Sequence, residues 1–310
     1  MRGSVKKQRT DLVGLVTEKA NPASADLDLK PSLQLARIMN SEDARVAAAV
    51  KRVLPQIARA IDIIASALQR GGRLIYVGTG TSGRIAALDA AECPPTFDTH
   101  RQTVQFIIAG GLRALGAAVE TDEDSPKLGE REIAKKKPGK NDVVVGIAAS
   151  GRTPFTVTAI AYARRHGAQT IAVTCNRNSP LEKAADLAIV TEVGPEVISG
   201  STRMKAGTAQ KMVLNMLSSG AMIRLGYVYG NLMVNLHQKN EKLADRALRI
   251  LQLTTGLGRK AAQKALRRSG NSIPLALVMS EAQVSRAEAQ RALKAANGHV
   301  RHAIAAARSL

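Results

Sequence analysis

The sequence predicts an α/β protein, in which a doubly wound parallel sheet is followed by a small C-terminal helical domain. Three features indicate this class. Short aliphatic segments recur in which both the odd and the even positions are apolar, as in parallel strands that are buried on both faces of a sheet. Glycine-rich turns and amphipathic stretches separate several of these segments, which gives the strand–helix–strand (βαβ) order of a doubly wound sheet. After about Leu243 no strand-like segment follows, and Ala, Arg, Gln and Leu dominate.

The expected elements follow one another along the chain. Strands are predicted at residues 74–77, 104–109, 143–149 and 170–174, with a weaker one at 187–190. Helices are predicted at 47–68, 84–91, 154–165 and 201–225, and short helices at 255–266, 272–279, 285–295 and 300–308. We therefore expect an N-terminal tail and arm over residues 1–45, the sheet domain over 46–243 and a helical bundle over 244–310.

Length and composition narrow the class of protein. The 310 residues, 45% of them hydrophobic, suffice for one large domain or for a main domain with a smaller one. No run of roughly 18 apolar residues occurs, and no apolar region follows the basic first ten residues, so we expect neither a membrane span nor a secretory signal. The two cysteines, Cys93 and Cys175, have no disulfide-framework or zinc-type spacing. These features predict a cytoplasmic protein.

The balance of charge is strongly basic. Lys and Arg number 45 against 25 acidic residues, a formal net charge of +20, which raises the question of nucleic acid. The basic residues gather in the N-terminal tail, around residues 135–140 and in the C-terminal helices, away from the motifs described next. The chain has no Trp and few other aromatic rings on which bases could stack. We therefore favour a solvated basic surface over nucleic-acid binding.

Two predicted strand-to-helix turns have closely similar compositions. GTGTSGR at residues 78–84 follows the first strand, and AASGRTP at 148–154 follows the third. Free backbone N–H groups and the positive end of the helix dipole suit a phosphate at such a turn, and hydroxyl groups add donors. One such turn is often purely structural, but two in one sheet indicate a binding site. The first is neither a Walker A loop nor a Rossmann fingerprint, which favours a compact phosphorylated molecule over a nucleotide.

A third stretch, GSTRMKAGTAQK at residues 200–211, also begins a helix with hydroxyl groups. Arg203 and Lys205 in it could complement an anionic substrate. They are equally well interpreted as surface charges in the first turn of a helix.

Two carboxylates are candidates for acid–base chemistry. Glu92 stands beside Cys93 and before Pro94 and Pro95, which we expect to stop the helix. Partial desolvation of Glu92 there would suit an acid catalyst. Glu123 lies in the acidic run ETDED at residues 120–124, whose ordinary interpretation is a solvated turn. Spacing alone leaves these possibilities open.

Other reactive groups are weak candidates. The five histidines are scattered, and none is paired at metal spacing outside the basic C-terminal helices. Cys93 has no histidine within a few residues, and no GxSxG motif occurs. We therefore expect neither a metal nor a redox cofactor.

Taken together, the motifs resemble the N-acetylmuramic acid 6-phosphate etherases, a family built on a sugar isomerase (SIS) domain. The resemblance runs from about Thr17 to the C-terminus, and its most specific stretches are residues 80–84, 88–97, 142–154, 201–211 and 230–234. It implies a lyase of amino-sugar and peptidoglycan recycling that needs no cofactor. Such an enzyme breaks the D-lactyl ether of N-acetylmuramic acid 6-phosphate by elimination and adds water, which gives N-acetylglucosamine 6-phosphate and D-lactate.

The resemblance also implies roles for particular residues. Glu92 would donate the proton to the departing lactate, and Glu123 would remove the proton at C2 of the sugar. The expected phosphate or sugar ligands are Ser82, Ser150 and Thr153, and less directly Ser201, Thr202 and Lys205. A homodimer with the site near the subunit interface is implied as well.

The sequence departs from the family pattern at three places. Leu112 stands where the family usually has glutamate, Asn235 where it usually has aspartate, and residues 237–239 also differ. Two other functions stay open. A sugar-phosphate sensor would need the phosphate turns but not both glutamates, and an aldose–ketose isomerase would share the C2 proton abstraction without expelling lactate. Because Glu92 is retained in its Glu-Cys-Pro-Pro setting, we favour the etherase.

Overall fold

A five-stranded parallel sheet forms the centre of the fold. The computed structural model describes residues 14–119, 121–235 and 241–309. The strands lie in the order β2-β1-β3-β4-β5. Their bounds are β1 (Leu74–Gly78), β2 (Val104–Ile108), β3 (Val143–Ile147), β4 (Gln169–Thr174) and β5 (Leu187–Val190). Every residue of β1 and β3 is buried, as the apolar pattern predicted, and the ends of the expected strands move by at most two residues.

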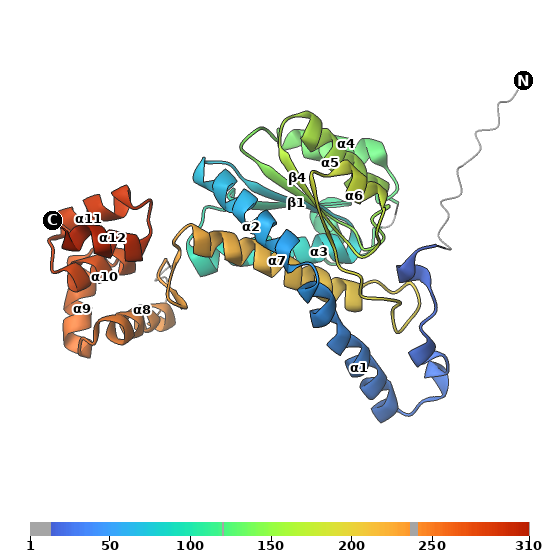
Figure 1. The fold of residues 1–310 in the computed structure, drawn as a ribbon, viewed down its shortest axis with the longest axis horizontal. Helices are drawn as coiled ribbons and strands as arrows, with labels where there is room; N and C mark the ends of the chain where they lie inside the picture. The colour runs from blue at the N-terminus through green and yellow to red at the C-terminus, as the bar shows by residue number, and fades with distance from the viewer. Residues whose placement is uncertain (1–13, 120, 236–240, 310) are drawn as a thin grey trace, which may run out of the picture.

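Helices cover both faces of this sheet (Figure 1). One face packs against α2 (Leu54–Gln69), α3 (Gly80–Phe97) and α7 (Lys205–Arg224), and α1 (Ser32–Lys51) packs on α7. The other packs against α4 (Pro126–Lys135), α5 (Pro154–Arg165) and α6 (Pro180–Ala184). Neighbouring residues of β1 divide between the two cores, since Tyr76 points into the first and Val77 into the second. The prediction of a doubly wound sheet is confirmed.

The C-terminal part forms a helical unit with its own hydrophobic core (Figure 1). Its helices are α8 (Glu241–Thr255), α9 (Arg259–Arg268), α10 (Ile273–Ala282), α11 (Arg286–Ala295) and α12 (Val300–Arg308). A short hairpin of β6 (Val228–Tyr229) and β7 (Leu232–Met233) packs against this core. The expected small helical domain is therefore present. The proposed division at 45/46 lies within α1, and the one at 243/244 lies within α8.

The helix predicted at residues 47–68 is two helices. Helix α1 begins at Ser32, and the chain turns at Arg52 and Val53 before α2. Pro55 lies in the first turn of α2, where its missing N–H group is tolerated. Three further helices, α4, α6 and α8, were not predicted, and α7 begins four residues later than expected.

Helix α3 does not stop at Pro94 and Pro95, as we expected, but continues to Phe97. The ring of Phe97 is buried and meets Tyr227 edge-on, with 6.4 Å between ring centroids. Asp98 then ends the helix in a left-handed conformation, with φ 56°. Burial of Phe97 by tertiary packing thus offsets the local cost of proline in the last turn.

Arg73 and Asp142 join the amino ends of β1 and β3. Nε and Nη2 of Arg73 donate to the two carboxylate oxygens of Asp142 at 3.0 and 2.6 Å. Burial raises the pKa of Asp142, but the hydrogen bonds from Arg73 outweigh it, so the pKa lies below its ordinary 3.8. The pair lies at the edge of the sheet opposite the turns that follow β1 and β3.

Asp142→Asn should lower the free energy of unfolding by about 2 kcal/mol at neutral pH, because charged hydrogen bonds are lost. Since the folded state holds fewer protons on this group than the unfolded state, the contribution is present above pH 3.8 and is lost as pH falls through the lower folded pKa. Denaturant unfolding of both proteins over this range measures it. A difference between them that stays constant below pH 3.8 would contradict the prediction.

Candidate active site

The two glycine-rich turns lie side by side at the carboxyl edge of the sheet. Strands β1 and β3 are neighbours, and Gly78 pairs with Ile147 at their ends. The chain passes from β1 into α3 on one face and from β3 into α5 on the other. This is the switch point of the strand order, where open α/β sheets bind ligands.

Neither helix that begins here is capped by a side chain. The N-cap residues Thr79 of α3 and Thr153 of α5 make no side-chain cap hydrogen bond. Gly80 and Gly151 have φ values of 47° and 66°, a left-handed conformation that glycine adopts at little cost. The first-turn N–H groups of two helices therefore converge on one place, together with the half-buried hydroxyls of Ser150 and Thr153. This arrangement suits a phosphate.

The backbone N–H groups at the N-terminus of α7 are already hydrogen-bonded within the protein. The backbone N–H groups of Lys205 and Ala206 both donate to the Glu196 carboxylate at 2.9 Å. The Lys205 side chain is fully buried, and its ammonium donates to Glu42 of α1. The chain thus uses Lys205 for an internal ion pair, and we leave it out of the substrate contacts proposed below.

The rest of the third stretch does approach the first turn. A Cβ atom placed on Gly207 would lie 3.5 Å from Thr81 Cγ2 and 3.6 Å from the Thr202 carbonyl oxygen. Ser201 and Thr202 are half-buried in the loop before α7. The stretch at residues 200–211 and the turn at 78–84 therefore share one neighbourhood.

Gln210 is a residue of this site that sequence reasoning missed. Ser82 Oγ donates to Gln210 Oε1 at 3.0 Å, and both residues are buried. Gln210 Nε2 is buried and has no hydrogen-bond partner among the described residues, and the same holds for Nε of Arg152 in the second turn. A buried donor without a partner costs roughly 1–3 kcal/mol, so the acceptor oxygens of a ligand would satisfy both groups. A glutamine among small helical residues carries no chemical pattern that sequence reasoning detects.

Glu123 lies between the two turns. Its Oε1 is 3.1 Å from the position that a Cβ atom on Gly80 would occupy. Its carbonyl oxygen accepts a hydrogen bond from the backbone N–H of Phe155 in the first turn of α5, at 3.2 Å. A half-buried carboxylate therefore stands beside the phosphate-type turns, as a base acting on a bound sugar would require. Glu120, the first residue of the same acidic run, lies outside the described residues.

Glu92 lies elsewhere on the molecule. It is twelve residues beyond Gly80 on the same helix, so a rise of 1.5 Å per residue puts the two Cα atoms about 18 Å apart. The side chain is exposed, and the chain alone does not supply the partial desolvation that we expected. One chain therefore does not bring Glu92 and Glu123 together.

The residues at the departures from the family pattern occupy different regions. Leu112 is 74% exposed in the short helix η4 (Gly111–Leu115), which contacts α3. Asn235 is half-buried just after β7. Residues 237–239 lie outside the described part of the chain.

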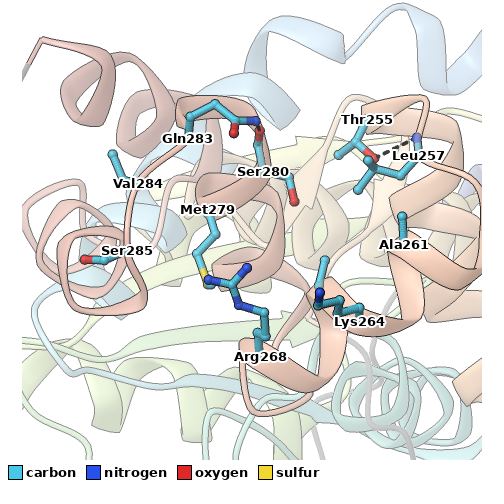
Figure 2. A pocket seen from close by; sticks show the side chains of 11 residues that line it. Thr255, Leu257, Ala261, Lys264, Arg268, Met279, Ser280, Gln283, Val284 and Ser285 are labelled. Carbon is cyan, nitrogen blue, oxygen red and sulfur yellow. Dashed lines mark hydrogen bonds between the residues drawn. The ribbon is translucent and has the colours of Figure 1, made fainter.

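A separate cavity lies in the C-terminal unit. It has a volume of about 510 Å³, and Figure 2 shows Lys264 and Arg268 of α9 near its wall, with Met279 and Ser280 of α10. No residue of the two turns and neither glutamate lines it. The site residues predicted from the sequence therefore lie in the sheet domain and do not line this cavity.

Two protein-family models match the sheet domain described above. The family model of the glucokinase regulatory protein N-terminal SIS domain matches residues 56–164, and the SIS domain model matches 136–219. The solved structure of a phosphoheptose isomerase from Francisella tularensis has a TM-score of 0.51 at 19% identity, and the match covers 63% of this chain and 100% of that one. This likeness shows the fold.

The N-acetylmuramic acid 6-phosphate etherase of Aeromonas hydrophila is 49% identical over 290 residues, which are 94% of this chain and 97% of that protein. The chain belongs to the N-acetylmuramic acid 6-phosphate etherase family. The etherase of Photorhabdus laumondii is 47% identical over 300 residues, 97% of this chain and 100% of its own. The likeness to these etherases thus includes the C-terminal helical unit, and the resemblance inferred from the motifs is confirmed.

None of the helices in the described part of this etherase-family chain is long and apolar enough to cross a membrane.

Proposed function

We propose that the chain cleaves the D-lactyl ether of N-acetylmuramic acid 6-phosphate as a carbon–oxygen lyase, without a cofactor. The products are N-acetylglucosamine 6-phosphate and D-lactate. Within the family, the observation that carries this proposal is the place of Glu123, whose carboxylate lies against Gly80 between the N-termini of α3 and α5, neither of which has a side-chain cap. The sugar phosphate is held where a base can act on it.

The phosphate binds at the first turns of α3 and α5. Backbone N–H groups and the two helix dipoles neutralise its charge, and Ser150 and Thr153 supply hydroxyl donors. The Ser82 hydroxyl orients Gln210 by donating to its Oε1. Ser201 and Thr202, in the loop before α7, contact the sugar on the side of the site that faces α7.

The elimination needs two carboxyl groups in opposite protonation states. In the open-chain sugar the C1 aldehyde acidifies the C2 proton, and the Glu123 carboxylate removes it. The electron pair left at C2 forms the C2–C3 double bond as the C3–O bond breaks, and protonated Glu92 gives its proton to the lactyl oxygen. Water then adds at C3 and gives up one proton to the Glu92 carboxylate, while Glu123 returns its proton to C2, so both carboxyl groups regain their starting states. Paired carboxyl groups can hold opposite states when their environments differ.

Gln210→Leu should raise KM for the sugar phosphate about tenfold with a smaller change in kcat, because the variant loses one hydrogen bond from a neutral amide donor to the charged phosphate. Steady-state kinetics of lactate release measures both constants. Gln263→Leu on the exposed side of α9 is the matched control and should leave both unchanged. An unchanged KM in Gln210→Leu would remove Gln210 from the site.

Release of D-lactate from N-acetylmuramic acid 6-phosphate tests the function directly. The purified chain should release one lactate per sugar, and N-acetylglucosamine 6-phosphate, which lacks the lactyl group, should compete. Binding of the sugar phosphate without lactate release would instead favour a sugar-phosphate sensor. Conversion between aldose and ketose without lactate would favour an isomerase.

We further propose that the protein works in the cytoplasm as a homodimer and that nucleic acid is not a partner. Cys93 and Cys175 are both buried free thiols, which fits a reducing compartment. Part of the basic C-terminal surface is neutralised internally, since Arg259 pairs with Asp245 and Arg308 with Glu281.

A further inference from the structure

We propose that the cavity of the C-terminal helical unit is a second ligand site, which binds a small phosphorylated sugar apart from the active site. The cavity lies between the end of α8, one face of α9, and the chain from the end of α10 to the start of α11 (Figure 2). Its volume of about 510 Å³ is typical of small-molecule sites. The proposed reaction makes no use of this unit's basic residues.

Two cations stand on one wall of the cavity. Lys264 and Arg268 are four residues apart on α9, so they share one helical face, with Cβ atoms about 5–6 Å apart. Figure 2 shows both on the same side of the cavity, with the guanidinium of Arg268 turned toward Met279. Neither cation has a hydrogen bond or an ion pair with a described residue, and no acidic residue of the described chain lines the cavity.

The acidic side chains of the same unit are engaged elsewhere. Three belong to the part described from residue 243 to 309. Asp245 pairs with Arg259 at 2.8 Å, and Glu281 pairs with Arg308 at 2.9 Å. The third, Glu288, accepts a backbone N–H at the start of α11 at 2.7 Å. The described part of the unit therefore offers no carboxylate to the two cations, and a bound ligand would supply the negative charge.

The spacing of the two cations suits a phosphate group. An arginine can donate two parallel N–H groups to phosphate oxygens, and a lysine adds a compact positive charge. A phosphate monoester carries a charge of about −1.5 to −2 at neutral pH, which matches two cations, whereas a carboxylate matches only one. Lys264 and Arg268 are both exposed, so binding should weaken as the salt concentration rises.

The rest of the cavity fits a hydroxylated body. The cavity is many times the roughly 30 Å³ of one water molecule, so a phosphate group fills only part of it. Ser280 Oγ makes no hydrogen bond to a described residue, and Gln283 uses its amide nitrogen on the Ser280 carbonyl at 2.6 Å, which leaves its Oε1 available. Leu257, Met279 and Val284 add half-buried apolar surface. A sugar ring presents both hydroxyl groups and C–H faces to such walls.

The walls of the cavity are fixed by hydrogen bonds within the unit. Thr255 Oγ1 accepts the backbone N–H of Leu257 at 3.4 Å, which Figure 2 shows as a dashed line. Ser269 Oγ donates to the Ser272 carbonyl at 2.8 Å and joins the end of α9 to the start of α10. A capping box at Ser285 begins α11. A site that is already formed loses less conformational freedom when a ligand binds.

Calorimetric titration of the full chain with N-acetylglucosamine 6-phosphate tests the proposal. The wild type should bind two molecules per chain, one at the sheet and one in the cavity. Lys264→Gln/Arg268→Gln should weaken only the second site, at least about tenfold, because charged hydrogen bonds are lost, and should keep lactate release unchanged. Lys260→Gln/Arg267→Gln is the matched control, since it removes the same charges from exposed positions of α9 that do not line the cavity. It should keep both sites.

Gln210→Leu distinguishes the two sites, because it should weaken binding at the sheet and leave the cavity unchanged. N-acetylglucosamine without phosphate should not bind in the cavity. A wild type that binds one molecule per chain, or a second site that survives Lys264→Gln/Arg268→Gln, would overturn the proposal. Equal weakening in the matched control would overturn it as well, since a general effect of charge would then suffice. A chain that binds the sugar phosphate in the cavity but releases no lactate would instead refute the proposed function.

Discussion

Glu123→Gln should lower kcat for lactate release by about 10²–10⁴-fold, the range typical for loss of a general base. Glutamine keeps the shape of the side chain and removes its ability to accept the C2 proton. KM should change much less, because the proposed phosphate ligands are the helix N-termini and not this carboxylate.

Exchange of the C2 proton with deuterium from solvent separates the two glutamates. Glu123→Gln should lose this exchange together with lactate release. Glu92→Gln should lose lactate release but keep the exchange, since it lacks only the proton donor to the leaving group. Glu130→Gln on α4, another exposed glutamate near the acidic run, is the control and should behave as wild type. Full exchange in Glu123→Gln would assign the base to another residue.

Lys205→Met should lower the free energy of unfolding by about 3 kcal/mol, because it leaves the buried Glu42 carboxylate without its ammonium partner. Glu42 keeps hydrogen bonds from Asn21 Nδ2 at 2.8 Å and from Arg45 Nη1 at 2.9 Å, which limits the loss. The ion pair also joins α1 to the first turn of α7, so the loop with Ser201 and Thr202 should become less ordered. Chemical denaturation with both proteins measures the difference.

The double variant Glu42→Leu/Lys205→Met serves as the control for this pair. With both charges removed, most of the lost stability should return, since no uncompensated charge stays buried. The same proteins decide the role of Lys205 in the reaction. If Lys205 were a substrate ligand, Lys205→Met would raise KM in both backgrounds and leave the stability unchanged.

Local pattern was sufficient for the sheet and for bringing the two candidate phosphate turns together. A strand that is buried on both faces is apolar throughout, so a few consecutive residues were enough to predict β1, β3 and β4. The two phosphate-type turns follow β1 and β3 directly, and the carboxyl ends of parallel strands share one edge. Their meeting therefore follows from the strand order alone.

Groups that are distant in sequence needed the tertiary structure. The hydrogen bond from Ser82 to Gln210 joins residues 128 positions apart, and the ion pair of Lys205 with Glu42 joins residues 163 positions apart. A local sequence pattern therefore predicts neither contact. The continuation of α3 to Phe97 contradicts its local proline signal, because burial of the ring against Tyr227 outweighs that signal.

The sequence by itself determined the α/β class, the family, the phosphate-type turns and the two candidate glutamates, because each of these is recognised from short stretches of contiguous residues. Only the tertiary structure decided that Lys205 faces inward, that Gln210 faces the first turn, and that Glu92 and Glu123 are far apart on one chain. Side-chain direction and separation depend on how helices pack over the sheet. That packing sums many weak long-range contacts which no single stretch of sequence contains.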